Sequence, residues 1–190
     1  MADSNDHTGC SPAIRGILAA AQFAAEKHAE QKRKGVSGEP YINHLIEVAG
    51  LIAHSIEPVD ENLIMAALLH DTVEDTGTTA EELEARFGHD VASLVLEVTD
   101  DKSLPKETRK RLQVETAPKK SVRAQMLKLA DKISNLRSII ERPPADWSLE
   151  RKRQYFEWAR QVVDGLSSPD PVLKAEFDRV YARFNEIAPR

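Results

Sequence analysis

The side chains best suited to chemistry lie in residues 70–75 (HDTVED), directly after an uncharged apolar stretch, residues 63–69. The apolar stretch predicts a buried helix. A helix repeats about every 3.6 residues, so His70 should lie one turn from Glu74, as Asp71 lies from Asp75. Carboxylates and an imidazole at the inner end of a buried helix need a positive charge among them. A divalent metal ion supplies that charge, and the alternative is a polar helix end with chance acidic residues.

A histidine and an aspartate elsewhere in the chain also lie next to or within apolar segments. His44 precedes the apolar face of a predicted helix, and Asp131 falls inside a long apolar helix, where a carboxylate is costly without a partner. Taken singly, His44 reads as a structural histidine and Asp131 as the ion-pair partner of a neighbouring lysine. Together with His70 and Asp71 they form a mixed nitrogen and oxygen set that suits Mn²⁺, Fe²⁺ or Zn²⁺ better than Mg²⁺ or Ca²⁺.

The elements that must position these residues are all helical. Apolar residues recur at helical spacing, and strand-like alternation is missing. The pattern predicts an all-α bundle of about eight to nine helices with short connections. The expected helices cover residues 13–34, 41–55, 61–74, 79–87, 89–99, 106–115, 121–140, 148–166 and 170–187. Residues 1–11 are expected to form a disordered leader, and residues 12–190 a single domain.

Composition narrows the functional class. The chain has 190 residues, 41% of them hydrophobic and 30% charged, which is typical of a soluble globular protein. The net charge of −5 lacks the basic surplus that is typical of nucleic-acid-binding proteins. The single cysteine, Cys10, is consistent with a reducing compartment, and no apolar run approaches the ~20 residues that span a bilayer. We therefore expect a cytoplasmic protein without membrane partners; the oligomeric state is not indicated.

Three segments together resemble a known family. They follow the order His…His-Asp…Asp of the HD superfamily, and they resemble the hydrolase domain of RelA/SpoT homologues. They are residues 38–44 (GEPYINH), 66–76 (AALLHDTVEDT) and 128–137 (KLADKISNLR). Three others are similar to the stand-alone small alarmone hydrolases, including the metazoan SpoT homologues: residues 98–102 (VTDDK), 110–115 (KRLQVE) and 155–159 (YFEWA). The resemblance covers about residues 13–185, and it departs at Leu45, where the family often has proline.

This resemblance implies an enzyme, a metal-dependent (p)ppGpp 3′-pyrophosphohydrolase that uses Mn²⁺ or another divalent transition metal. Its substrate would be a small-molecule nucleotide, cleaved to GDP or GTP and pyrophosphate. The metal ligands that it implies are His44, His70, Asp71 and Asp131. The catalytic pair that it implies is Glu74 and Asp75, which would orient and deprotonate the attacking water.

The resemblance also implies part of the substrate pocket. It places Arg33 and Lys34 beside the guanine and phosphates, Asn135 at the nucleoside and Tyr155 in the pocket wall. Without it, Arg33 and Lys34 would read as ordinary helix-end charges. Lys106 and Arg111, in a basic stretch, are further candidates to bind the 5′-diphosphate, although a charge run is more often a solvated face.

Other functions compete with this one. A different HD phosphohydrolase, such as an NADPH 2′-phosphatase or a nucleotidase, would use the same metal centre. A non-catalytic alarmone sensor is disfavoured because every ligand and both acidic residues are present, and a synthetase is disfavoured because it needs further domains. Since histidine must be neutral to bind a metal, we expect activity to fall below about pH 6.

Overall fold

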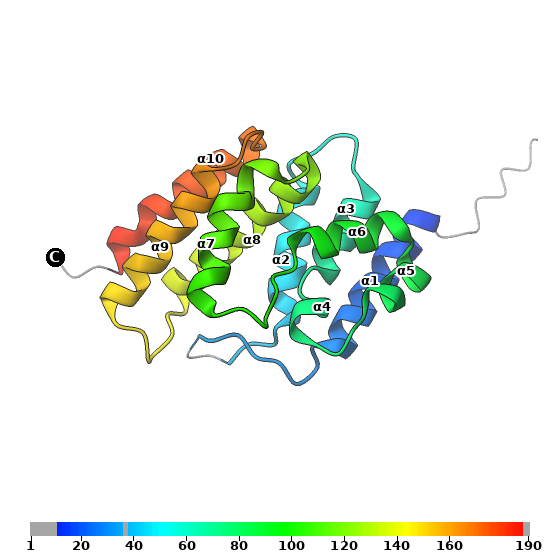
Figure 1. Ribbon diagram of the computed structural model, residues 1–190, viewed down its shortest axis with the longest axis horizontal. Helices are drawn as coiled ribbons and strands as arrows, with labels where there is room; N and C mark the ends of the chain where they lie inside the picture. Colours follow the sequence, from blue (N-terminus) through cyan, green and yellow to red (C-terminus); the bar gives the residue numbers. More distant parts are fainter. Residues whose placement is uncertain (1–10, 36–37, 188–190) are drawn as a thin grey trace, which may run out of the picture.

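The structure is a computed structural model, and it describes residues 11–35 and 38–187. Over these residues it contains ten α-helices and two 3₁₀ turns and no β-strand, so the all-α prediction is confirmed (Figure 1). No helix in the described ranges is long and apolar enough to cross a membrane. The expected leader falls almost wholly outside the described residues and stays a prediction.

The helices follow one another through short connections. In chain order they are α1 (Pro12–Lys27), α2 (Ile42–Ala53), α3 (Glu61–Leu69), α4 (Thr72–Asp75), α5 (Ala80–Phe87), α6 (His89–Val98), α7 (Lys106–Thr116), α8 (Val122–Glu141), α9 (Leu149–Asp164) and α10 (Pro171–Ala182). In Figure 1, α7, α9 and α10 lie toward one end of the molecule, while α1, α3, α5 and α6 lie toward the other. Helices α2 and α8 run between the two groups.

Helix α8 is the central element, because it contacts α2, α3, α6, α9 and α10. Its start is capped by the Ser121 hydroxyl, which accepts a hydrogen bond from the Ala124 amide. It ends at Glu141, just before two prolines that cannot continue a helix. Since packing surrounds it, even its polar residues Lys132 and Ser134 are buried. Asp131 is thereby carried into the interior.

The helix predicted over residues 61–74 is wrong in one respect, because it breaks between α3 and α4. The ring Nδ1 of His70 hydrogen-bonds the Ala67 carbonyl at 2.8 Å, and the Thr72 hydroxyl donates to the Leu69 carbonyl at 2.6 Å. These side chains occupy carbonyls that backbone amides would use in a continuous helix. His70 and Asp71 therefore lie at the junction between α3 and α4. Their side chains are not oriented as a single continuous helix would orient them.

The first helix is also shorter than predicted. Helix α1 ends at Lys27, and residues 28–35 and 38–41 then lie alongside one another in a loop before α2. Two cross-loop hydrogen bonds hold it, from the Arg33 amide to the Glu39 carbonyl at 2.8 Å and from the Tyr41 amide to the Gln31 carbonyl at 3.0 Å. These cross-loop contacts end the helix earlier than the predicted boundary at residue 34.

The close approach of this loop to the end of α8 yields a stability prediction. A Cβ at Gly35 would lie 2.6 Å from the Arg142 carbonyl oxygen, whereas one at Gly50, inside α2, would meet nothing within 4 Å. We expect Gly35→Ala to lower the free energy of unfolding by about 1–3 kcal/mol through overpacking. The matched variant Gly50→Ala should raise it by about 0.5–1 kcal/mol, since alanine favours helix. Urea denaturation followed by circular dichroism measures both, and equal effects would contradict the steric account.

Candidate active site

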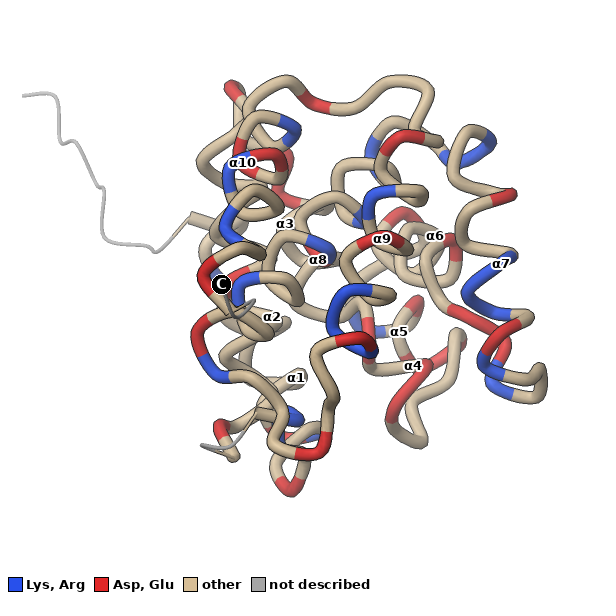
Figure 2. The backbone as a smooth tube through the Cα atoms, turned by 90° about the vertical axis from the view of Figure 1, so that its left-hand side faces the viewer, with Lys and Arg blue, Asp and Glu red and all other residues tan. Residues whose placement is uncertain are grey.

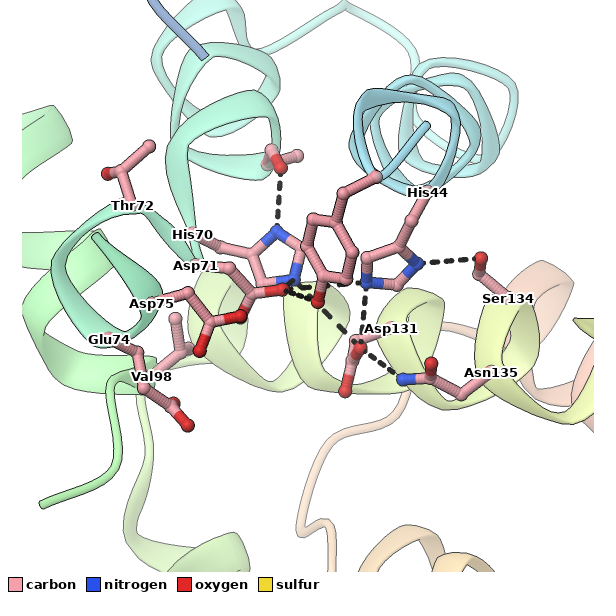
Figure 3. A network of polar contacts seen from close by, with 12 residues as sticks. His44, His70, Asp71, Thr72, Glu74, Asp75, Val98, Asp131, Ser134 and Asn135 are labelled. Atoms are coloured by element: carbon pink, nitrogen blue, oxygen red, sulfur yellow. Dashed lines mark hydrogen bonds and ion pairs between the residues drawn. The ribbon is translucent and has the colours of Figure 1, made fainter. Parts of the chain in front are cut away.

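Two imidazoles and two carboxylates meet where α2, the α3–α4 junction and α8 converge (Figure 3). The Nε2 atom of His44 lies 3.3 Å from Oδ1 of Asp131, and Nε2 of His70 lies 3.1 Å from Oδ2 of Asp71. The two rings are edge to face, with centroids 5.2 Å apart. The four side chains expected to bind a metal thus lie together, although they come from distant parts of the chain.

Hydrogen bonds on the far side of each ring determine how the imidazoles can bind. The Ala67 carbonyl can only accept, so Nδ1 of His70 carries a proton. The Ser134 hydroxyl donates to Glu47 at 2.6 Å and therefore accepts from Nδ1 of His44 at 2.8 Å. Both rings turn Nε2 toward the carboxylates, and both Nε2 atoms are buried without a hydrogen-bond partner among the described residues. Two such nitrogens are suited to bind a metal.

The donor atoms are close enough to share one ion. Ligand atoms of His44, His70 and Asp131 all lie within 4.8 Å of one another, and Oδ2 of Asp71 is 3.7 Å from Nε2 of His44. The Tyr41 hydroxyl donates to Asp71 at 2.6 Å, which orients that carboxylate. This set of two imidazole nitrogens and two carboxylates fits a divalent metal ion.

The acid–base balance of the centre shows why a positive charge belongs there. Burial lowers the pKa of His44. Burial also opposes the charged form of His70, but the negative charges of Asp71 and Asp131 outweigh it and raise the pKa of His70 to about 9. Without a metal, therefore, a proton on His70 balances the carboxylates. A metal ion must displace that proton, so the two compete for one position.

The predicted catalytic pair lies on α4, beside the metal centre. Glu74 accepts a hydrogen bond from the Asp100 amide at 3.1 Å and lies 3.5 Å from the Arg109 guanidinium. Burial raises the pKa of Glu74, although the Asp100 amide opposes this. Asp75 accepts a hydrogen bond from Gln31 and forms an ion pair with Lys102. Glu74 thus holds a proton more readily than an exposed glutamate, which suits a general base near neutral pH.

A cavity of about 450 Å³ opens beside these residues. It is lined by Glu74 and Asp75, by the expected metal ligands His70, Asp71 and Asp131, and by the expected substrate residues Arg33, Lys34, Lys106, Asn135 and Tyr155. His44, the fourth expected ligand, does not line the cavity. Arg111 does not line this cavity, because its side chain is 60% exposed on α7 and forms an ion pair with Glu115. Its expected role as a substrate ligand gains no support from this position.

The charge of the cavity differs from that of the whole chain. Nine lysines and arginines line it against five aspartates and glutamates, although the chain carries a net charge of −5. In Figure 2 the tube of α7 carries several blue stretches, while the short α4 is mostly red. The cations therefore collect around the acidic floor, and the cavity is suited to an anionic ligand.

One wall of the cavity is aromatic, and the sequence indicated only part of it. Tyr155 lies between two tryptophans, with ring centroids 5.6 Å from Trp147 and 5.2 Å from Trp158. Burial raises the pKa of Tyr155 to about 12, so its hydroxyl stays neutral. The spacing of Tyr155 and Trp158 by three residues would have placed both on one helix face. Trp147 lies in a loop before α9 and carries no such signal.

A family model described as "HD domain" matches residues 20–156. The chain belongs to the HD-domain family. Comparison with individual relatives assigns the chain to a narrower group within this family. It is 51% identical to the guanosine-3′,5′-bis(diphosphate) 3′-pyrophosphohydrolase MESH1 of Xenopus tropicalis over 87% of this chain and 92% of that one. It is 52% identical to the Homo sapiens protein of the same name over the same shares. The chain is therefore an HD-domain protein of the MESH1 group.

A solved structure supports this placement. It matches with a TM-score of 0.86 and 45% sequence identity, covering 93% of this chain and 97% of the other. It is described as a metazoan orthologue of SpoT that hydrolyses ppGpp and plays a role in starvation responses. The resemblance seen in the motifs thus extends over nearly the whole described fold.

The hydrogen-bonded chain behind His44 yields a prediction about metal binding in this HD-domain protein. Ser134→Ala removes the acceptor that holds Nδ1 of His44, so the ring loses its fixed orientation. We expect affinity for a divalent metal to fall about 10–100-fold. Isothermal titration with Mn²⁺ measures the affinity without substrate. Ser138→Ala, one turn further along α8, is the control, and an equal effect of both variants would contradict the role of Ser134.

Proposed function

We propose that this protein is a (p)ppGpp 3′-pyrophosphohydrolase that uses Mn²⁺, with Glu74 and Asp75 as its acidic pair and His44, His70, Asp71 and Asp131 as metal ligands. The main support is the position of the acidic pair, beside a histidine and aspartate centre and on the floor of a cation-lined cavity. The relatives named above, which share about half their residues with this chain, carry the name of this activity.

The cavity matches the parts of the substrate. A guanine base can stack on the aromatic wall, where Lys132 also lies 4.5 Å from the Trp158 ring centroid. Two diphosphates need several cations, and Arg33, Lys34 and Lys106 line the same cavity. Its volume of about 450 Å³ is ordinary for a small-ligand site. We propose these residues as the nucleotide-binding set.

The residues of the chain account for the hydrolytic step. The oxygen of water forms a bond to the phosphorus next to the 3′-oxygen, the bond from that phosphorus to the 3′-oxygen breaks, and one proton passes from water to the 3′-oxygen. Glu74 accepts the proton from water, because its raised pKa makes it a competent base. A bound divalent ion supplies Lewis acidity, which lowers the pKa of water and neutralises phosphate charge. The products are GDP or GTP and pyrophosphate.

The remaining parts of the proposal rest on composition and ligand chemistry. Mn²⁺ is favoured by the mixed nitrogen and oxygen ligand set, which Fe²⁺ and Zn²⁺ also suit. A cytoplasmic location and the lack of nucleic-acid and membrane partners stay predictions from the sequence. The oligomeric state is left open.

The first test is pyrophosphate release from ppGpp by the purified protein with Mn²⁺. We expect turnover that chelation abolishes. The double variant Glu74→Gln, Asp75→Asn should lose at least about 100-fold in kcat, because general-base catalysis contributes about 10²–10⁴-fold. Metal content is measured in parallel as the control. A variant that keeps its metal and also keeps its activity would contradict the role of the acidic pair.

A side-by-side comparison of ppGpp with NADPH separates the proposed substrate from the closest alternative. Phosphate release from NADPH without pyrophosphate release from ppGpp would contradict the proposed function while leaving the metal centre intact. The absence of bound metal would remove its basis altogether.

The raised pKa of Glu74 predicts the pH dependence of the reaction. The base must be ionised to accept a proton, so kcat should fall as pH drops through a pKa above the ordinary glutamate value of 4.5. Together with the requirement for neutral histidines, this predicts declining activity below about pH 6. The measurement is kcat at saturating metal across the pH range, with metal content followed at each point. A flat profile down to about pH 5 with metal retained would contradict the prediction.

A further inference from the structure

We propose that Gln31 is a positioning residue for Asp75 and that His28 fixes the orientation of the Gln31 amide. The inference rests on the proposed function, in which Asp75 belongs to the acidic pair. Neither His28 nor Gln31 was expected at the site. Both lie in the loop between α1 and α2, and the mechanism above uses neither of them.

The first observation is the burial of His28. Although charged residues surround it in the sequence, only 3% of the residue is exposed. Its ring stacks on the Tyr41 ring with centroids 5.1 Å apart and an interplanar angle of 28°. Its Nδ1 lies 2.5 Å from Oε1 of Gln31. Burying an imidazole without charge partners is costly, and a single specific hydrogen bond is what this ring gains.

The second observation is the direction of the Gln31 amide. Its Nε2 donates to Oδ2 of Asp75 at 2.8 Å, so its oxygen faces His28. An amide oxygen can only accept, which requires that Nδ1 of His28 carry the proton. If the amide were flipped, its oxygen would face the Asp75 carboxylate and its NH₂ group would face an N–H donor. The Asp75 carboxylate thus sets the direction of the amide, and the Nδ1–H tautomer of His28 completes the chain and holds the amide in that direction.

The third observation concerns the other partner of Asp75. Lys102 pairs with Oδ1, but its side chain is 47% exposed on the loop before α7 and lines the same cavity as the candidate phosphate-binding cations. An anionic substrate competes for that lysine. Gln31 is neutral and part-buried, so substrate does not draw it away. It therefore keeps the carboxylate in place when Lys102 turns to phosphate.

The same loop also reaches the metal centre. Tyr41, on which His28 stacks, donates its hydroxyl to Asp71. The Gln31 carbonyl accepts from the Tyr41 amide at 3.0 Å, so the two residues are fixed to one another. The pair His28 and Gln31 therefore sets the position of Asp75 relative to a metal ligand, which is the geometry that the hydrolytic step needs.

The test uses the full chain with Mn²⁺ and measures kcat and KM for ppGpp. Gln31→Leu removes the donor at similar volume, and His28→Phe keeps a ring against Tyr41 but removes the Nδ1 proton. We expect Gln31→Leu to lower kcat about 10–100-fold with KM within about twofold, because misplacing a reacting group by about 1 Å costs up to 10²-fold. Affinity for Mn²⁺ should not change. Gln22→Leu, on the exposed face of α1, is the matched control.

The double variant separates positioning from general stability. If His28 acts through Gln31, His28→Phe combined with Gln31→Leu should lose no more kcat than Gln31→Leu alone. If the losses of kcat in the two single variants add up in the double variant, His28 does not act through Gln31. If Gln31→Leu raises KM and leaves kcat unchanged, Gln31 does not position Asp75. Should Gln31→Leu fail to fold, Gln31→Glu keeps the shape of the side chain, removes the donor and must also lower kcat.

Failure of the proposed function gives a different pattern. A wild-type protein that does not hydrolyse ppGpp overturns both the function and this inference. A wild-type protein that hydrolyses ppGpp, with Gln31→Leu equally active, overturns the positioning role alone.

Discussion

The partial burial of Asp71 and Asp131 beside two imidazoles is the constraint on which the rest of the structure depends. Carboxylates at this depth are stable only with positive charge beside them. The buried Lys132, 2.8 Å from Asp131, provides part of it, and the same carboxylates raise the pKa of His70. A divalent ion provides more charge at the same place. The requirement explains why α8 is surrounded by other helices, since it must bring a carboxylate and its lysine to the histidines of α2 and α3.

The break between α3 and α4 is a second consequence of this constraint. A continuous helix would leave Nδ1 of His70 without its carbonyl partner, and the ring could then turn. By ending α3, the chain exchanges backbone hydrogen bonds for side-chain bonds from His70 and Thr72. The exchange fixes the ring and begins a new helical turn for Glu74 and Asp75 (Figure 3). The local irregularity thus serves both the metal centre and the acidic pair.

How far the sequence predicts the site depends on the range of the interactions involved. The candidate ligands His44, His70, Asp71 and Asp131 could be predicted because polar residues interrupt apolar helical runs, a signal contained within a few residues, whereas the catalytic role predicted for Glu74 and Asp75 came from the family resemblance. The direction of His70 could not, because it depends on which group takes the Ala67 carbonyl. The burial of His28 was missed because its stacking partner lies in another element, and the Ser134–Glu47 bond joins residues far apart in the chain. Whether a segment forms a helix is determined by neighbouring residues. The direction of a side-chain hydrogen bond depends on residues that are distant in the sequence.

The arrangement of charge resolves a conflict inherent in the proposed reaction. A site for a polyanion must be cationic, yet the hydrolytic step needs ionised carboxylates in it. In this fold the acidic pair comes from α4, while the cations around it come from the loop after α1, from the segment that runs from Lys102 into α7, and from α8, which supplies Lys128 and Lys132 beside Asp131. Arg109 and Lys102 reach the acidic pair, so each carboxylate already has a cation that phosphate can attract. In the proposed reaction, substrate phosphates would draw these cations off the acidic pair, and the carboxylates would become better bases as the phosphates arrive. Cations from several elements around one short acidic helix would thus let binding and base catalysis share one cavity.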